Sequence, residues 1–180
     1  MARLRPGRTC RTPNSQSWAR YSVRKPRKNF IRALPHTSVQ VFNSGVDKPE
    51  YVLRAVLTPE QHVQLRSNAL EAARLAALHK LTEAIPESFY LKLLVYPHNV
   101  IRENKMASGA GADRVSRGMT LSFGRPTSVA ARIRKTQSVL MIKTAKENRT
   151  VAVTALKKAA KKLSGTYKVV VSETGAAAAA

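Results

Sequence analysis

The chain has 180 residues, 43% of them hydrophobic, which suits one folded domain with an appended arm and disfavours wholesale disorder. It carries 32 Lys and Arg but only 10 Asp and Glu, so its formal net charge is +22 and a polyanionic partner is expected. Nucleic acid is favoured over an anionic membrane surface, because the sequence has no lipidation motif, no basic amphipathic helix with bulky aromatics and no apolar run of roughly eighteen residues.

The number of cysteines and the N-terminal residues indicate the cellular compartment of the protein. Cys10 is the single cysteine, so no internal disulfide can form and the reducing cytoplasm is expected. The start MARLRPGR lacks the apolar stretch of a secretory signal. An organellar transit peptide is the alternative for so arginine-rich a start, but Pro6, Pro13 and Pro26 disfavour the amphipathic helix that such peptides form.

The N-terminal segment has the composition of a basic arm. Residues 1–46 contain ten Lys and Arg and no Asp or Glu. We expect residues 1–34 to form an extended arm that orders against phosphates, with a solvated tail as the alternative. Trp18, Tyr21 and Phe30 lie among these cations, and such rings can stack on unpaired bases. Pinning the arm to the folded body is the alternative role for the rings, and it is favoured for Phe30.

The folded part is expected to begin with two short strands and a long helix. The strands are predicted over 38–42 and 50–57. Thr58 as N-cap, Pro59 at the first helical position and Gln61 as the capping-box partner predict that the helix begins there. It should continue to about Ala84, before Pro86. Two rows of apolar side chains are expected on its packing side: Leu65, Ala69, Ala72 and Ala76, with Val63, Leu70, Ala73 and Ala77 beside them.

The second half is expected to hold a further helix and further strands. The helix covers 148–163 and ends at Ser164 and Gly165. Its apolar stripe comprises Ala152, Ala155, Leu156, Ala159, Ala160 and Leu163, and the opposite face comprises Lys157, Lys158, Lys161 and Lys162. Strands are predicted over 88–97, 100–102, 127–135, 138–145 and 167–172, with a polar turn at 135–137.

Two long helices alternating with short strands predict an α+β fold. We expect a two-layer sandwich in which the helices cover one side of a mixed or mostly antiparallel sheet. The globular domain should span 35–172, with a glycine-rich loop at 105–118 and a disordered alanine tail at 173–180.

Metal and cofactor chemistry find no support in the sequence. The four histidines form no close pair, and one cysteine cannot complete a ligand set. The glycine loop lacks the third glycine of G-x-G-x-x-G, where Arg114 stands, and Ala112 follows Gly111 where a Walker loop needs Gly-Lys-Ser/Thr. Glu103 and Asp113 could form an acid/base pair, but the neighbouring cations favour ion pairing instead. We therefore expect no enzyme and no cofactor.

The residues resemble a known family. The stretch YPHNVIRENKMASGAGADRVSRGM (96–119), followed by FGRP and SVAAR, is similar to the large-subunit ribosomal protein called L-ten-e in archaea and eukaryotes and L-sixteen in bacteria. LRSNALEAARLAA (65–77) resembles the family's first helix, and FIRALPHTSVQVFNSG (30–45) its first strand. The resemblance implies a cytoplasmic ribosomal protein that braces large-subunit rRNA near the site where aminoacyl-tRNA enters. It also implies a glycine loop directed toward the peptidyl-transferase region and tRNA.

Together with the charge pattern, the resemblance predicts two sets of site residues and a set of partners. The rRNA-binding residues are expected to be Arg3, Arg5, Arg8, Arg11, Trp18, Arg20, Arg24, Lys25, Arg27, Lys28, Arg32, Lys157, Lys158, Lys161 and Lys162. The tRNA-facing loop is expected to use Arg102, Lys105, Met106, Ser108, Gly109, Gly111, Asp113, Arg114, Arg117 and Gly118. Partners are rRNA, tRNA and neighbouring ribosomal proteins, with no membrane and no homo-oligomer. The alternatives are a general DNA-binding or architectural protein and an RNA-processing enzyme that uses Glu103 and Asp113.

Overall fold

A computed structural model describes residues 31, 33–104, 106–107, 109–116, 118–120 and 122–173. The predicted arm (apart from residues 31, 33 and 34) and the tail after residue 173 lie outside the described residues. In chain order the elements are β1 (Asn43–Gly45), β2 (Leu53–Pro59), β3 (Val63–Arg66), α1 (Ser67–Ala84), β4 (Phe89–Leu93), β5 (Asn99–Glu103), α2 (Ala112–Val115), β6 (Arg125–Ile133), β7 (Leu140–Thr144), the 3-10 turn η3 (Lys146–Asn148), α3 (Arg149–Ala160) and β8 (Tyr167–Glu173).

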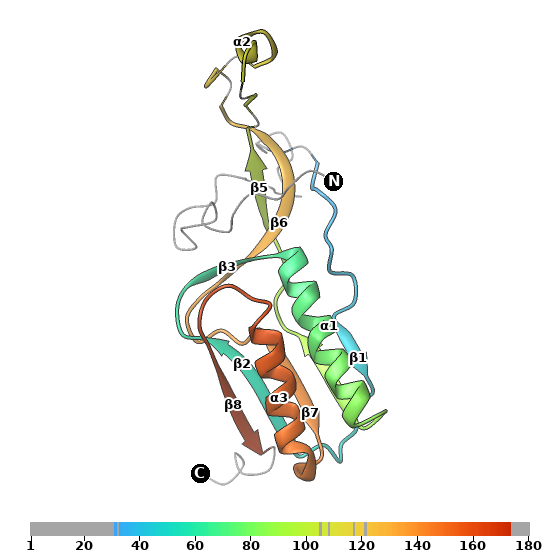
Figure 1. Cartoon of the computed structure of the whole chain (residues 1–180). Coiled ribbons are helices and arrows are strands. Elements are labelled where there is room, and N and C mark those ends of the chain that lie inside the picture. Colours follow the sequence, from blue (N-terminus) through green and yellow to red (C-terminus); the bar gives the residue numbers. More distant parts are fainter. Residues whose placement is uncertain are drawn as a thin grey trace.

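The body of the molecule is a two-layer α+β sandwich, as the element pattern predicts. Five strands form one sheet in the order β1-β4-β7-β2-β8, and α1 and α3 lie side by side on one face of it (Figure 1). All the strand pairs of the described residues are antiparallel. The prediction of a mostly antiparallel sheet is therefore confirmed.

Small side chains let the two helices approach each other and the sheet. Ala73 and Ala77 of α1 and Ala155 and Ala159 of α3 are fully buried, and they join leucines and isoleucine of β2, β4 and β7 in the main core. Of the two apolar rows predicted for the first helix, Leu65 and Val63 lie in β3, and within the helix the second row is the buried one. Ala72 of the first row is exposed to solvent. The packing face is centred on Leu70, Ala73, Ala77 and Leu81 instead.

The first helix begins eight residues later than its sequence predicts, because its N-cap is Arg66 and not Thr58. Thr58 and Pro59 end β2, where they lie opposite Lys168 and Tyr167 of β8. Residues 63–66 then form β3, whose Val63 and Leu65 are buried while their neighbours are half-buried. This period of two is a strand pattern, and the prediction of a capping box at 58–61 was wrong because tertiary pairing overrides a local capping signal. The helix has no side-chain cap at Arg66.

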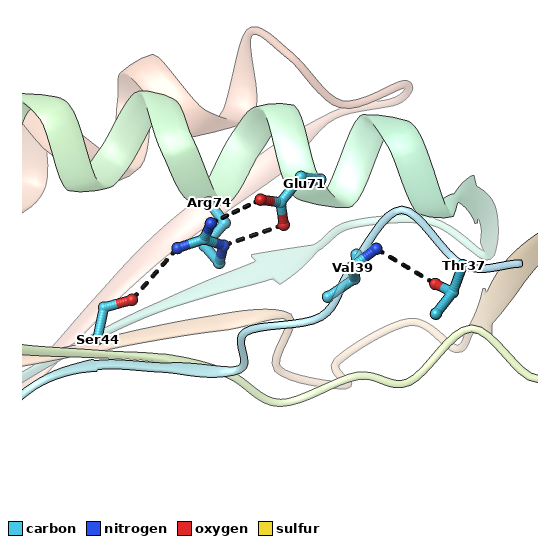
Figure 2. A network of polar contacts seen from close by, with 5 residues as sticks. All are labelled: Thr37, Val39, Ser44, Glu71 and Arg74. Carbon is cyan, nitrogen blue, oxygen red and sulfur yellow. Dashed lines mark hydrogen bonds and ion pairs between the residues drawn. The ribbon is translucent and has the colours of Figure 1, made fainter.

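The first strand also differs from its prediction. β1 comprises residues 43–45 and not the predicted 38–42. The amide N–H of Val39 donates to Oγ1 of Thr37 at 3.2 Å in a local turn and not to a neighbouring strand (Figure 2). A buried Arg74 of α1 instead ties β1 to the helix layer. Its guanidinium donates to the Glu71 carboxylate at 2.6 and 3.0 Å and to Oγ of Ser44 at 3.3 Å (Figure 2).

A second, three-stranded sheet in the order β3-β6-β5 leaves the body. The long strand β6 pairs with β3 near the body and with β5 farther out, so that β5 and β6 form a ribbon that carries α2 at its far end (Figure 1). The predicted strands at 127–135 and 138–145 are both present, and the turn between them places Gln137 N 3.1 Å from the Arg134 carbonyl. They belong to different sheets, because β7 pairs with β2 and β4.

Candidate nucleic-acid interface

One predicted surface is the lysine face of the second helix. Ala152, Ala155, Leu156 and Ala159 of α3 are buried, which leaves the opposite side of the helix to solvent. That side carries Lys157, Lys158, Lys161 and Lys162, and all four are exposed. The helix proper ends at residue 160, and the last two lysines follow in a tightened turn in which Lys162 N donates to the Ala159 carbonyl at 2.9 Å.

The charge of these lysines also affects an acidic residue on the neighbouring helix. The pKa of Glu83 on α1 lies below its usual value, mainly because Lys80 donates a hydrogen bond to it at 3.0 Å. The charges of Lys80 and, more weakly, Lys158 act in the same direction. The carboxylate is fully exposed, so it neutralises little of the lysine face. The four lysines therefore present closely spaced positive charge to an approaching polyanion.

The second predicted surface is the glycine loop, and its base is well defined. β5 and β6 pair out to Glu103 and Arg125, with a bulge between Ile101 and Arg102. The Arg102 guanidinium carbon lies 3.7 Å from the ring centroid of Phe123, and its Nη1 donates to the carbonyl of the same residue. This contact joins the two ends of the loop. Arg102 thus sits at the base of the loop and not at its tip.

Gly124 completes this base through a close backbone approach. Its φ is +76°, and a Cβ atom built on it would lie 2.8 Å from the carbonyl carbon of Glu103 and 2.9 Å from the amide of Asn104. Both distances are shorter than real Cβ contacts, so only glycine fits. Sequence reasoning did not select Phe123 or Gly124. No local sequence signal identifies them, because their position opposite Arg102 depends on how β5 and β6 pair.

The outer part of the loop contains one short helix and open glycines. Ala112 N donates to the Gly109 carbonyl at 3.2 Å, and Arg114 N to the Gly111 carbonyl at 3.0 Å, at the start of α2. Gly109, Gly111 and Gly118 have positive φ, and no atom lies within 4 Å of a Cβ built on any of them. Their role is therefore backbone conformation in open space and not packing. Met106 and Met119 are 51% and 69% exposed.

Several predicted site residues lie outside the described residues. They are the arm residues Arg3, Arg5, Arg8, Arg11, Trp18, Arg20, Arg24, Lys25, Arg27, Lys28 and Arg32, and the loop residues Lys105, Ser108 and Arg117. The backbone of Asp113 belongs to α2, but its side chain is not described. The lysine face and the glycine loop lie on different elements, α3 and the β5–β6 ribbon, and the structure does not bring them together into one patch (Figure 1).

Two further observations concern metal ions and membranes. No group of three or more His, Cys, Asp or Glu among its residues could hold a metal ion. Within the same residues, no helix is long and apolar enough to span a bilayer. What the described geometry offers is a basic helix face and a projecting loop on a rigid two-layer body. These features define a basic structural protein of the kind that packs against nucleic acid.

Comparison with known proteins supplies the family. The family model described as Ribosomal protein L16p/L10e matches residues 18–170. The chain is 41% identical over 148 residues to the large ribosomal subunit protein uL16 of Thermoplasma acidophilum, covering 82% of this chain and 84% of that protein. It is 42% identical over 163 residues to the uL16 of Metallosphaera sedula (89% of each) and 36% identical over 171 residues to that of Methanococcus maripaludis (94% and 95%). The chain therefore belongs to the ribosomal protein L16p/L10e family, whose members are structural proteins of the ribosome and not enzymes.

Proposed function

We propose that this chain is a structural constituent of the large ribosomal subunit that binds rRNA near the site where aminoacyl-tRNA enters and supports tRNA positioning. The family membership and the names of the relatives support the place in the large subunit, in the cytoplasm. The net charge of +22 and the exposed lysine face support an rRNA partner. Neighbouring ribosomal proteins complete the set of partners.

The observation that carries the tRNA part of the proposal is the position of the glycine loop. It lies at the far end of the β5–β6 ribbon, away from the helices and the main core (Figure 1). Its base is held by Arg102, Phe123 and Gly124, whereas a Cβ atom built on Gly109, Gly111 or Gly118 would meet no other atom within 4 Å. A fixed base with a small-residue tip can reach into a crowded RNA surface without unfolding the body.

The rRNA part of the proposal rests on charge. Lysines and arginines that neutralise phosphates release counterions, and this release drives binding without reading sequence. A-form RNA also hides its bases in a deep, narrow major groove, so contacts to phosphates and 2′-hydroxyls dominate. The arm residues Arg3 to Arg32, the lysine face and Arg114 are the proposed contributors. The chemistry of peptide-bond formation does not pass through this protein in the proposal.

Deletion of Ser108–Ala112 tests the role of the loop. The deletion removes the tip and leaves the contacts of Arg102 and Gly124 in place, so we expect unchanged thermal unfolding and normal incorporation into the large subunit. Accommodation of aminoacyl-tRNA by the reconstituted ribosomes should be slower. The matched control is Gly124→Ala, which disturbs the base through the backbone contact to Glu103. A tip deletion that unfolds the domain or blocks incorporation would show that the loop is structural.

A further inference from the structure

Three aromatic rings outside the lysine face and the glycine loop form a ladder from the core to the surface. Phe42 is half-buried against the main core. The ring of Tyr96 stacks on it, with centroids 5.5 Å apart and an interplanar angle of 19°. The ring of His98 follows at 4.7 Å from Tyr96, tilted by 48°. Tyr96 is 49% exposed and His98 is exposed, so the outer two rings face solvent.

The ladder is held rigidly. The Phe42 carbonyl accepts a hydrogen bond from Leu93 N at 2.8 Å, which extends the pairing of β1 with β4 to the foot of the ladder. Buried Pro97 separates the two outer rings, and its ring restricts the backbone between them. Asn99, the next residue after His98, begins β5 and donates to Oε1 of Gln64 on β3 at 3.3 Å. Both ends of the segment are therefore fixed to sheets.

We infer that the ladder of Phe42, Tyr96 and His98 is a stacking site for an unpaired base of the rRNA. Tyrosine and histidine are among the side chains on which splayed bases stack. A ring that served only the fold would be covered, whereas half of Tyr96 faces water. Because the rings are already ordered, the protein loses little side-chain entropy when a base stacks on them.

The charge of the chain favours RNA over a protein as the occupant. With 32 basic against 10 acidic residues, the whole molecule attracts phosphates and repels most basic ribosomal proteins. Val41, next to Phe42 in sequence, and Leu94, two residues before Tyr96, are also exposed, which adds apolar surface on the same two segments. This inference rests on the proposed rRNA binding and adds to it a specific, uncharged contact.

The test compares Tyr96→Leu with Tyr96→Phe in the full chain, with protein-free large-subunit rRNA as the probe. Leucine keeps an apolar contact with Phe42 but removes the stacking face, whereas phenylalanine keeps the face. We expect Tyr96→Leu to weaken binding by about 5- to 150-fold and Tyr96→Phe to bind like the unchanged protein. The slope of log affinity against log salt should be the same in all three, because stacking releases no counterions.

Ultraviolet cross-linking of the same complex gives an independent readout. Trypsin cleaves after Lys92 and Arg102, and the peptide between them contains Tyr96 as its single tyrosine. We expect a nucleotide adduct on this peptide. If Tyr96→Leu binds rRNA as tightly as the unchanged chain and the adduct is absent, the inference is overturned. If Tyr96→Leu binds free rRNA normally but fails to enter assembled subunits, the rings contact a protein. Failure of the proposed rRNA binding would give a different result, since the unchanged chain would then bind rRNA without steep salt dependence.

Discussion

At the scale of single residues, the buried Arg74 guanidinium joins the helix layer to the sheet edge. Arg74 is only 7% exposed, and the Glu71 carboxylate raises its pKa above the usual value, chiefly through their hydrogen bonds. Removal of Glu71 would leave a buried cation that still donates to the Ser44 hydroxyl at 3.3 Å but has lost its carboxylate partner. Unpaired buried charge is costly, because desolvation is no longer offset.

We therefore expect Glu71→Ala to lower the free energy of unfolding by roughly 1–3 kcal/mol. Glu83→Ala is the matched control, since Glu83 pairs with Lys80 on the same helix at the same spacing but lies in solvent. Both variants gain the same helix propensity from alanine, so their difference isolates the buried pair. Urea unfolding followed by circular dichroism measures it. Equal stabilities of the two variants would contradict the role given to Arg74.

Some contacts of the candidate site could be predicted from the sequence and others could not. The lysine face was accessible from the sequence, because a period of 3.6 places residues 157, 158, 161 and 162 on one side of any helix. The Arg102–Phe123 contact was not, since it depends on how β5 and β6 pair across the 21 residues between them and on the bulge in that pairing. The aromatic ladder depends likewise on the pairing of β1 with β4, which brings Phe42 to Tyr96.

At the scale of elements, β8 carries a group whose ionisation opposes folding. Burial raises the pKa of the Tyr167 hydroxyl well above its usual value near 10.0, and the hydroxyl donates to the Ser164 carbonyl at 2.8 Å. In the unfolded chain this hydroxyl ionises near its usual pKa, whereas in the folded chain it stays protonated. Unfolding therefore releases a proton above about pH 10, and stability falls as the pH rises through that range.

Tyr167→Phe should remove this dependence. At pH 8 we expect the variant to be slightly less stable, because it lacks the hydrogen bond to Ser164. Between about pH 9 and pH 11 the stability of the unchanged protein should fall more steeply than that of the variant. Urea midpoints of both proteins across this range provide the comparison, and the many lysines titrate equally in each. Parallel curves would show that burial of Tyr167 has no effect on its ionisation.

Most elements were predictable from local pattern, and the exceptions have one cause. The second helix, the final strand and the end of α1 before Pro86 follow from periodicity and from glycine and proline positions. The errors lie at 38–45 and 58–66, where pairing with distant strands decides the structure. β3 exists because β6 pairs with it, and β1 because β4 does. Pairing with strands so distant in sequence cannot be predicted from a local signal such as a capping box.

At the scale of the whole molecule, the fold separates the lysine face, proposed to bind rRNA, from the glycine loop, proposed to extend toward tRNA. The lysine face lies on the body, whereas the glycine loop projects on its own ribbon (Figure 1). Under the proposed function, loss of body charge should weaken attachment to rRNA, and loss of the loop tip should leave attachment unchanged. The salt dependence of binding can separate the two effects, because it counts the phosphates that the protein neutralises.

We expect replacement of Lys157, Lys158, Lys161 and Lys162 by glutamine to weaken rRNA binding and to reduce the slope of log affinity against log salt. If all four contact phosphates, the slope should fall by roughly 3 to 4 units. The matched control replaces Lys80, Lys143 and Lys146, each of which already pairs with a carboxylate at 2.7 to 3.2 Å. Those replacements remove a paired cation and should change the slope less. An equal fall per lysine replaced in the two variants would mean that only net charge matters and that the lysine face is no specific contact surface.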